Sequence, residues 1–352
     1  MSSENFKLFS IWMDTPNYLN DINETVTQVI VDNTVEIEYA QLQGDVDGLK
    51  KLLDKCRTYN VPVTLLTASS TYNKLIDEES LRGVTVVDDP CFWIAKHASM
   101  MLGGNNIKIN IERGYDIFDN NAGLAENIQY LYITMNNRIK LHRAQMMDIL
   151  AKYYLIDLGA VGWKNDNCFN TRYQYKYWEP TPLYLDCNIH DDINQDILPI
   201  EFKHSFMQLV AESEEEKFMI SEKTAVPLLF NKPFLVVSCK NFHKNLQELG
   251  FQIYDEVFDY GFDSIDDQYT RVVEVVKNVH RLRKYDNTQL QELTEQLRPK
   301  LRHNRQLAIN YLKRTSNMFK SYYDTITRHG YVSRLEPIVA TNLAMNLNKF
   351  KK

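Results

Sequence analysis

Three polar residues whose types could bind a ligand stand together in mid-chain: Ser221, Glu222 and Lys223. An apolar run, Phe206–Ala211, comes before them, and a second one, Phe234–Val237, follows. This order of strand, polar loop, helix and strand predicts half of a parallel α/β unit. Ser221 fits the N-cap of the helix, which puts Glu222 at the positive end of the helix dipole. The plain alternative is an exposed first helical turn without a ligand.

A second group of cations, Lys140, His142 and Arg143, stands at the start of another expected helix, after an apolar run at Tyr130–Met135. A cation at a helix N-terminus costs about 0.3–1 kcal/mol unless an anion is held there. Ligands of parallel sheets lie beyond the carboxyl ends of the strands. We therefore expect Arg143 and Lys223 to bind one anion, such as a diphosphate. An ordinary surface arginine is the alternative.

The other elements follow from apolar periodicity. In the first part of the chain we expect strands at 26–31, 61–66 and 84–87 and a helix over 45–57. In the second part we expect helices over 143–158, 242–249, 267–280 and 288–312, and a short strand at 251–254. Gly159 would end the first of these helices, and Pro299 would break the last. The polar segment 103–127 predicts a linker between two domains.

Composition excludes several classes of protein. The chain has 352 residues, 44% apolar and 24% charged, which is ordinary for a globular protein of about two domains. It contains no glycine-rich dinucleotide fingerprint and no P-loop, which argues against a dehydrogenase and a P-loop NTPase. No run of 18 apolar residues and no secretory signal pattern occurs, so we expect no membrane span. The five cysteines are scattered, which predicts reduced thiols and a cytoplasmic location.

Charge is unevenly distributed along the chain. Residues 277–352 hold 16 Lys and Arg against 5 Asp and Glu, a net of +11, whereas the whole chain carries −6. The favoured interpretation is a solvated helical region that complements an acidic body. The alternative is a surface for an anionic partner such as nucleic acid.

The two cationic motifs together resemble the donor-nucleotide motif of α-1,3-fucosyltransferases. They are most similar to the divergent glycosyltransferase-like proteins encoded by phages. The resemblance spans roughly residues 130–276. In that family a Glu-Lys pair holds the ribose hydroxyls and the diphosphate, which implies these roles for Glu222 and Lys223. In the same family, an arginine at the start of the first helix of the nucleotide domain contacts phosphate, which implies this role for Arg143. The pair Glu212-Ser213 matches an Asn-Ser pair of the family.

The resemblance implies an α/β fold in which two Rossmann-like domains with parallel sheets face a cleft. An acceptor domain would span residues 1–127 and a donor domain residues 128–302. Helices over 303–352 would pack back toward the first domain. The implied function is transfer of a sugar from a nucleotide-sugar donor to an acceptor hydroxyl. The acceptor is open and includes a glycan or a modified nucleic acid. We expect inversion of configuration, no metal and no other cofactor.

Inverting transfer needs a base to deprotonate the acceptor hydroxyl. Asp89, just past the third expected strand, is the first choice, with Asp88 and Asp32 as alternatives. The expected donor-binding residues are Arg143, His142, Glu212, Ser213, Ser221, Glu222 and Lys223. Two alternatives remain open: an inactive structural or binding protein of the same fold, and a nucleic-acid-binding protein that uses the basic C-terminal region.

Overall fold

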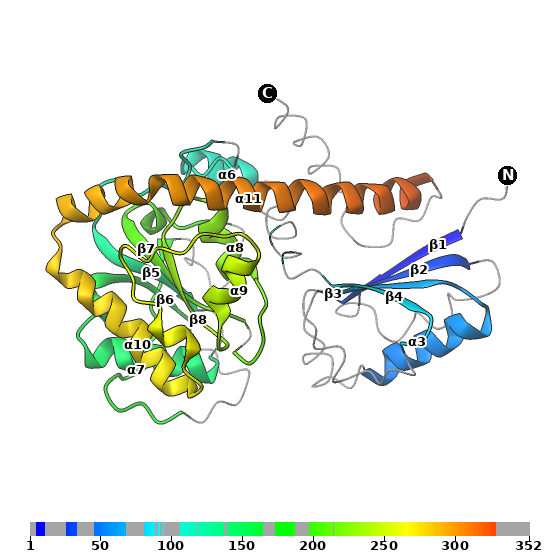
Figure 1. Ribbon diagram of the computed structural model, residues 1–352, viewed down its shortest axis with the longest axis horizontal. Coiled ribbons are helices and arrows are strands. Elements are labelled where there is room, and N and C mark those ends of the chain that lie inside the picture. Colours follow the sequence, from blue (N-terminus) through cyan, green and yellow to red (C-terminus); the bar gives the residue numbers. More distant parts are fainter. Residues whose placement is uncertain are drawn as a thin grey trace. The chain divides into compact units, whose positions relative to one another are not determined.

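The computed structural model shows an α/β protein with two parallel sheets (Figure 1). The residues that it describes are 5–10, 26–33, 46–67, 81–88, 91, 94, 106–117, 119–136, 139–164, 173–186, 197–213 and 215–328. Contacts divide the chain into two compact units, Met1–Ala95 with Lys313–Lys351, and Lys96–Leu312 with Lys352. Of the described helices, none is both long and apolar enough to cross a membrane.

The first unit contains a four-stranded parallel sheet of order β1-β2-β3-β4. Its elements are β1 (Asn5–Ser10), β2 (Val26–Asn33), α3 (Val46–Thr58), β3 (Val63–Thr67) and β4 (Val84–Asp88). Helix α3 buries Leu49, Leu52, Leu53 and Cys56, which recur at helical spacing along one face. The three expected strands and the helix are present, and β1 is an additional strand at the edge.

The second unit contains a sheet of order β6-β5-β7-β8, in which every pair of neighbours is parallel. The strands are β5 (Tyr130–Asn136), β6 (Gly159–Trp163), β7 (Ser205–Ala211) and β8 (Phe234–Val237). The helices are α6 (Asn106–Glu112), α7 (Leu141–Lys152), α8 (Glu222–Leu229), α9 (Phe242–Glu248), α10 (Gln268–Arg281) and α11 (Asn287–Arg328).

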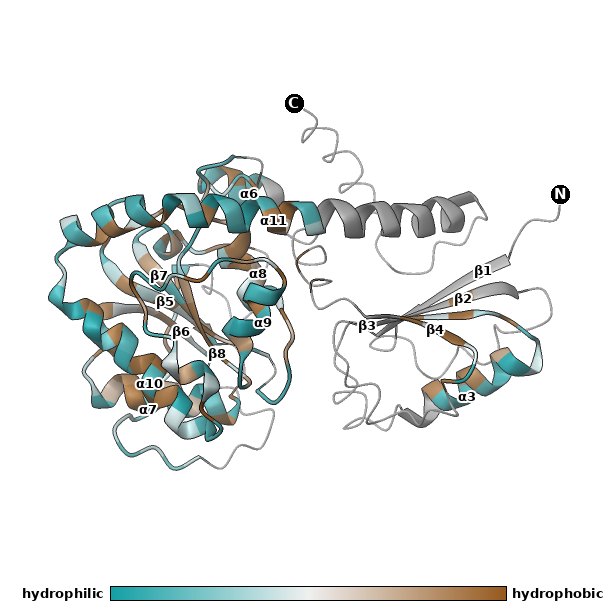
Figure 2. Ribbon diagram, in the orientation of Figure 1, coloured by the Kyte–Doolittle hydropathy of each residue, from teal (hydrophilic) through white to brown (hydrophobic). Residues whose placement is uncertain are grey.

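Helices cover this second sheet on both faces. Figure 1 shows α7 and α10 side by side on one face, with α6 and the first half of α11 on the other. All seven residues of β7 are buried, as in a parallel strand with both faces covered. In Figure 2 the apolar colouring is concentrated on the strands and on the parts of α7 and α10 that lie against each other.

Our expectation that the helix over 143–158 ends at Gly159 is wrong. Helix α7 ends at Lys152, and Tyr154 adopts a left-handed φ of 54° directly after it. Gly159 does not end α7: it follows a short 3-10 helix, Ile156–Leu158, and begins strand β6 with an extended φ of −114°. A Cβ atom at Gly159 would lie 2.3 Å from the Tyr132 ring, so the ring on the neighbouring strand requires a glycine here.

The expected linker at 103–127 is also wrong for the part of it that the structure describes. The Tyr115 hydroxyl donates to the carbonyl of Pro199 at 2.6 Å, and its ring meets Phe202 edge-on. The Asn231 side-chain amide donates to the carbonyl of Ala122 at 3.1 Å. This segment therefore packs on the second unit, and the chain divides at Ala95 rather than at residue 127.

The last described helix is longer than expected. Pro299 lies inside α11 without ending it, and the boundary between the two compact units falls within the same helix, after Leu312. An interior proline costs roughly 3 kcal/mol. Burial of Leu290, Leu297 and Leu301 against the unit offsets this cost. The segment 251–254, expected as a strand, is not in a sheet.

Candidate functional site

The second sheet has a topological switch point between β5 and β7. The chain leaves β5 through α7 toward β6 on one side, and leaves β7 through α8 toward β8 on the other. The loops after β5 and β7 therefore start from adjacent strands at the carboxyl edge of the sheet. Ligands of open parallel sheets bind at such a point. Both cationic motifs singled out in the sequence lie in these two loops or open the helices that follow them.

Lys140, before α7, and two residues of the first turn of α7, His142 and Arg143, reach the residues that follow β7. Lys140 donates to the carbonyl of Ser213. The ring Nε2 of His142 lies 2.8 Å from the carbonyl oxygen of Glu212, and the Arg143 guanidinium donates to the same oxygen at 3.0 Å. His142 and Arg143 are both buried. The two loops are thus bonded to each other across the switch point.

The carboxylate of Glu212 is fully buried and orders the β7–α8 loop. Its Oε1 accepts from the backbone N–H of Ser221 at 2.9 Å and from the Thr224 hydroxyl at 2.7 Å. Its Oε2 accepts from the backbone N–H of Ser213 at 2.6 Å and from the Ser221 hydroxyl. Four donors therefore satisfy this carboxylate inside the protein. A direct bond from Glu212 to a ligand would have to replace one of them.

Helix α8 begins as the sequence indicates. Ser221 is its N-cap, and the Ser221 hydroxyl oxygen accepts from the backbone N–H of Lys223 at 3.2 Å. The Lys223 ammonium group pairs with Glu222 and also donates to the Ser213 hydroxyl at 3.1 Å. Both charged side chains keep 17% of their surface exposed. The pair is therefore within reach of solvent at the carboxyl edge of the sheet.

His142 is bonded to an acceptor at each ring nitrogen. Its Nδ1 lies 2.6 Å from Oε2 of Glu215, opposite the Glu212 carbonyl at Nε2. Burial raises the pKa of Glu215, but the bond from His142, with Gln268 and a nearby lysine, outweighs burial and brings the pKa to about 2. Burial, with the charge of Arg143, lowers the pKa of His142 below its usual 6.5, although the contact with Glu215 acts in the opposite direction. Two acceptors are satisfied only by a doubly protonated ring.

A second buried histidine shows the opposite arrangement. The Nδ1 of His243 lies 2.9 Å from the Asp263 carboxylate, and its Nε2 accepts from the backbone N–H of Val236 at 3.2 Å. One donor and one acceptor suit a neutral ring with its proton on Nδ1. The His243 ring is therefore held by one donor and one acceptor, whereas both ring nitrogens of His142 face acceptors.

Sequence reasoning did not identify Glu215 or Gln268 as site residues. Gln268 is the first residue of α10, and its side-chain amide donates to Oε2 of Glu215 at 2.7 Å. The only sequence signal for Glu215 was its place in an acidic loop directly after a buried strand. The partner in α10 is far away in sequence, so it becomes visible only in the fold.

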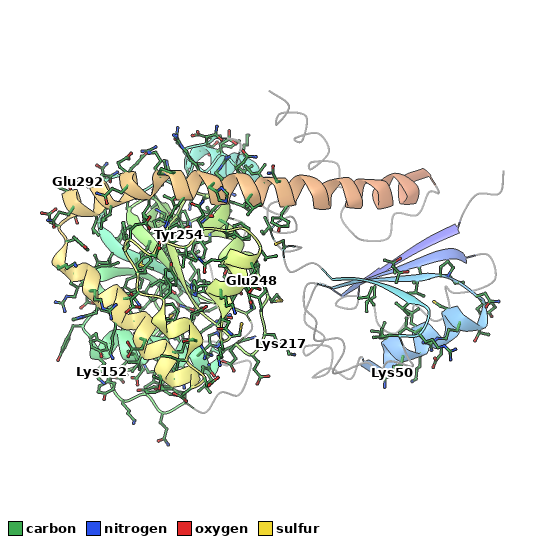
Figure 3. All side chains as sticks on the ribbon, viewed as in Figure 1. Lys50, Lys152, Lys217, Glu248, Tyr254 and Glu292 are labelled. Carbon is green, nitrogen blue, oxygen red and sulfur yellow. The ribbon has the colours of Figure 1, made fainter. Side chains whose placement is uncertain are left out.

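An aromatic segment beside the switch point was likewise missed. Asp148, buried on α7, accepts from the backbone N–H groups of residues 176–178 at 2.7–3.1 Å and from the Tyr173 hydroxyl at 3.1 Å. Trp178 meets Trp163, the last residue of β6, edge-on at 5.1 Å. A charged residue on an otherwise apolar helical stretch was the available signal. Figure 3 shows how densely side chains fill this unit, with Lys217 marking the β7–α8 loop.

The proposed catalytic base, Asp89, lies outside the described residues. The backbone of Asp88 ends β4, and that of Asp32 lies near the end of β2. Asp88 pairs with Thr67 of β3, and Asp32 pairs with the neighbouring Leu66. The backbones of Asp88 and Asp32 therefore both lie at the carboxyl edge of the first sheet. The side chains of Asp88 and Asp32 are not among the described ones.

Nothing in the described part of the chain brings together three or more His, Cys, Asp or Glu side chains that could hold a metal ion. Among the described residues, positive charge at the switch point comes from the side chains already named and from the N-termini of α7 and α8. This arrangement is suited to binding a phosphate or a carboxylate.

No family model, curated protein or solved structure matches the chain.

Proposed function

We propose that the second unit binds the diphosphate of a nucleotide sugar at the switch point between β5 and β7, and that the protein is a glycosyltransferase. The observation that carries this proposal is the convergence of two cationic motifs, from separate βα units, at one edge of one sheet. Arg143 and Lys223 both donate to the segment Glu212-Ser213. A ligand at this edge would meet positive charge from two sides.

The proposed reaction places the acceptor at the first unit. The two units would act as Rossmann-like domains that face a cleft, in the arrangement that the sequence resemblance implies. Fixed cations would neutralise the diphosphate as it leaves, which is where electrostatic stabilisation lowers the barrier most. Asp89 would take the proton of the acceptor hydroxyl. No step in this scheme requires a metal ion.

A second candidate is an inactive structural or binding protein of the same fold. The pairing of Glu222 with Lys223, and the saturation of Glu212 by four internal donors, favour it, because these residues already have partners within the chain. Only the transferase predicts both nucleotide binding and turnover of a nucleotide sugar.

Nucleic-acid binding through the basic C-terminal region finds less support. In the described part of this region, Arg298 pairs with Glu295, and Lys300 pairs with Asp255 and Glu256. These cations complement acids of the same unit, which agrees with the favoured interpretation of the charge asymmetry. Exposed pairs of this kind contribute little stability, about 0–1 kcal/mol each, but they reduce the charge available to a polyanion.

The test has two stages. Thermal unfolding in the presence of UDP, GDP, CDP and dTDP identifies which nucleobase the protein prefers. A ligand at 100 times its Kd raises the free energy of unfolding by about 2.7 kcal/mol. Hydrolysis of the matching nucleotide sugars is then followed with time. Binding together with slow hydrolysis supports the transferase, absence of any turnover supports the second candidate, and no binding contradicts the transferase.

A further inference from the structure

Glu215 occupies a place that suits an external anion. Its Oε2 lies 2.6 Å from the ring Nδ1 of His142 and accepts from the Gln268 amide at 2.7 Å. The two donors come from the first turns of α7 and α10, and each of these helix ends carries partial positive charge. One carboxylate of the chain is thus held between a cation, an amide and two helix N-termini.

His142 needs an anion in this position. Its side chain is 0% exposed, Arg143 stands next to it, and its Nε2 already points at the Glu212 carbonyl. Moving Glu215 away would leave Nδ1 of this buried ring without its partner. Another negative group that reached Nδ1 would restore the contact. The other charged groups around the ring are Lys140, which reaches Ser213, and the saturated Glu212 carboxylate.

Glu215 can leave without disturbing the core. Its side chain is 30% exposed, and it lies in the loop between β7 and α8 rather than in a strand or helix. The donors that it would vacate belong to residues fixed by their helices. An exchange between this carboxylate and a solvent anion therefore needs only a local movement of the loop.

We propose that Glu215 is an autoinhibitory internal anion, which competes with a phosphate group of the ligand for His142 and Gln268. This inference rests on the proposed function, because it assumes that the switch point binds a phosphorylated ligand. The apparent Kd of a site equals its intrinsic Kd divided by the fraction in the competent state. If Glu215 closes the site about 90% of the time, removing its charge tightens binding about tenfold.

The experiment measures binding of inorganic pyrophosphate to the full chain by calorimetry. The variants are Glu215→Gln, which removes the competing charge but keeps the size, and Glu215→Asp, which keeps the charge but shortens the reach by one methylene. The matched control is Glu216→Gln, because Glu216 is exposed in the same loop. We expect about tenfold tighter binding for Glu215→Gln, a smaller gain for Glu215→Asp, and no more than twofold for the control.

Each outcome decides the matter. Equal affinities of Glu215→Gln and Glu216→Gln, with clear binding by the unaltered chain, would overturn the competition while leaving the proposed function intact. Weaker binding by Glu215→Gln would show that Glu215 assists the ligand, and would also overturn it. If no variant bound pyrophosphate, both the proposed function and this inference would fall. Should Glu215→Gln not fold, the comparison of Glu215→Asp with the control gives the same answer.

Discussion

Arg143 and Lys223 belong to different βα units, yet they donate to neighbouring residues at the end of β7. The Arg143 guanidinium donates to the Glu212 carbonyl at 3.0 Å, and the Lys223 ammonium donates to the Ser213 hydroxyl at 3.1 Å. They differ in exposure, because Arg143 is buried and Lys223 is partly accessible. Arg143 therefore contributes to the fold, and we expect its loss to cost stability. Lys223 is the side chain better placed to meet a ligand.

The first prediction concerns the buried carboxylate of Glu212. Glu212→Gln keeps its shape but turns an acceptor into an N–H donor that faces other donors. At least one bond is lost and one buried donor is left without a partner. We expect a loss of about 2–4 kcal/mol in the free energy of unfolding, from the cost of broken charged hydrogen bonds. Urea unfolding measures it, with exposed Glu216→Gln as the control. A change in the free energy of unfolding equal to that of the control would show that the four hydrogen bonds of Glu212 do not stabilise the fold.

The second prediction concerns Gly159. An added Cβ would lie 2.3 Å from the Tyr132 ring, too close for any ordinary contact. We expect Gly159→Ala to destabilise the protein by about 1–3 kcal/mol, as overpacking of a tight core does. Gly261→Ala is the control, because its nearest neighbour would be a flexible Asp259 oxygen at 3.2 Å. Equal stabilities of the two variants in urea would contradict the proposed packing.

Local signals predicted much of the second unit. Apolar runs identified β5, β7 and β8, because strands that are covered on both faces need apolar side chains throughout. The cap of α8 also followed from chemistry, because Ser221 occupies the N-cap position that its hydroxyl group predicted.

Elements that depend on distant neighbours were not predicted. Strand β6 is short and contains two glycines, and one of them, Gly159, is explained only by the Tyr132 ring beside it. Pro299 sits within a helix because packing outweighs its local cost. The contact of Glu215 with His142 and Gln268 joins three separate segments, so no spacing in the sequence reveals it.

The third prediction is a pH dependence due to Lys232. Its ammonium group is buried, donates to the Ser205 carbonyl at 2.8 Å, and lies 4.9 Å from the Phe202 ring. Burial lowers the pKa of Lys232 from 10.5 to about 7. Between these values the unfolded chain binds more protons than the folded one, so stability rises with pH.

The measurement is urea unfolding at pH 7 and pH 9. From this single group we expect the free energy of unfolding to rise by an amount on the order of 2 kcal/mol between pH 7 and pH 9. Lys232→Met removes the titrating group, so the rise in the free energy of unfolding between the two pH values should be smaller in this variant by about that amount. Parallel pH profiles of the two proteins would show that Lys232 is not the group responsible.

The most direct test of the central claim is calorimetric titration of the unaltered chain and two lysine variants with the nucleoside diphosphate that it binds best. Lys223→Ala removes a cation at the carboxyl edge of the second sheet. Lys152→Ala removes one at the opposite end of α7, and Figure 3 shows that side chain on the far side of the unit from Lys217 in the β7–α8 loop. We expect Lys223→Ala to weaken binding by about 1.5–3 kcal/mol, the scale of a charge-assisted hydrogen bond, and Lys152→Ala to leave it unchanged. An equal effect of both substitutions, or no binding of any nucleoside diphosphate by the unaltered chain, would contradict a nucleotide site at the β5–β7 switch point.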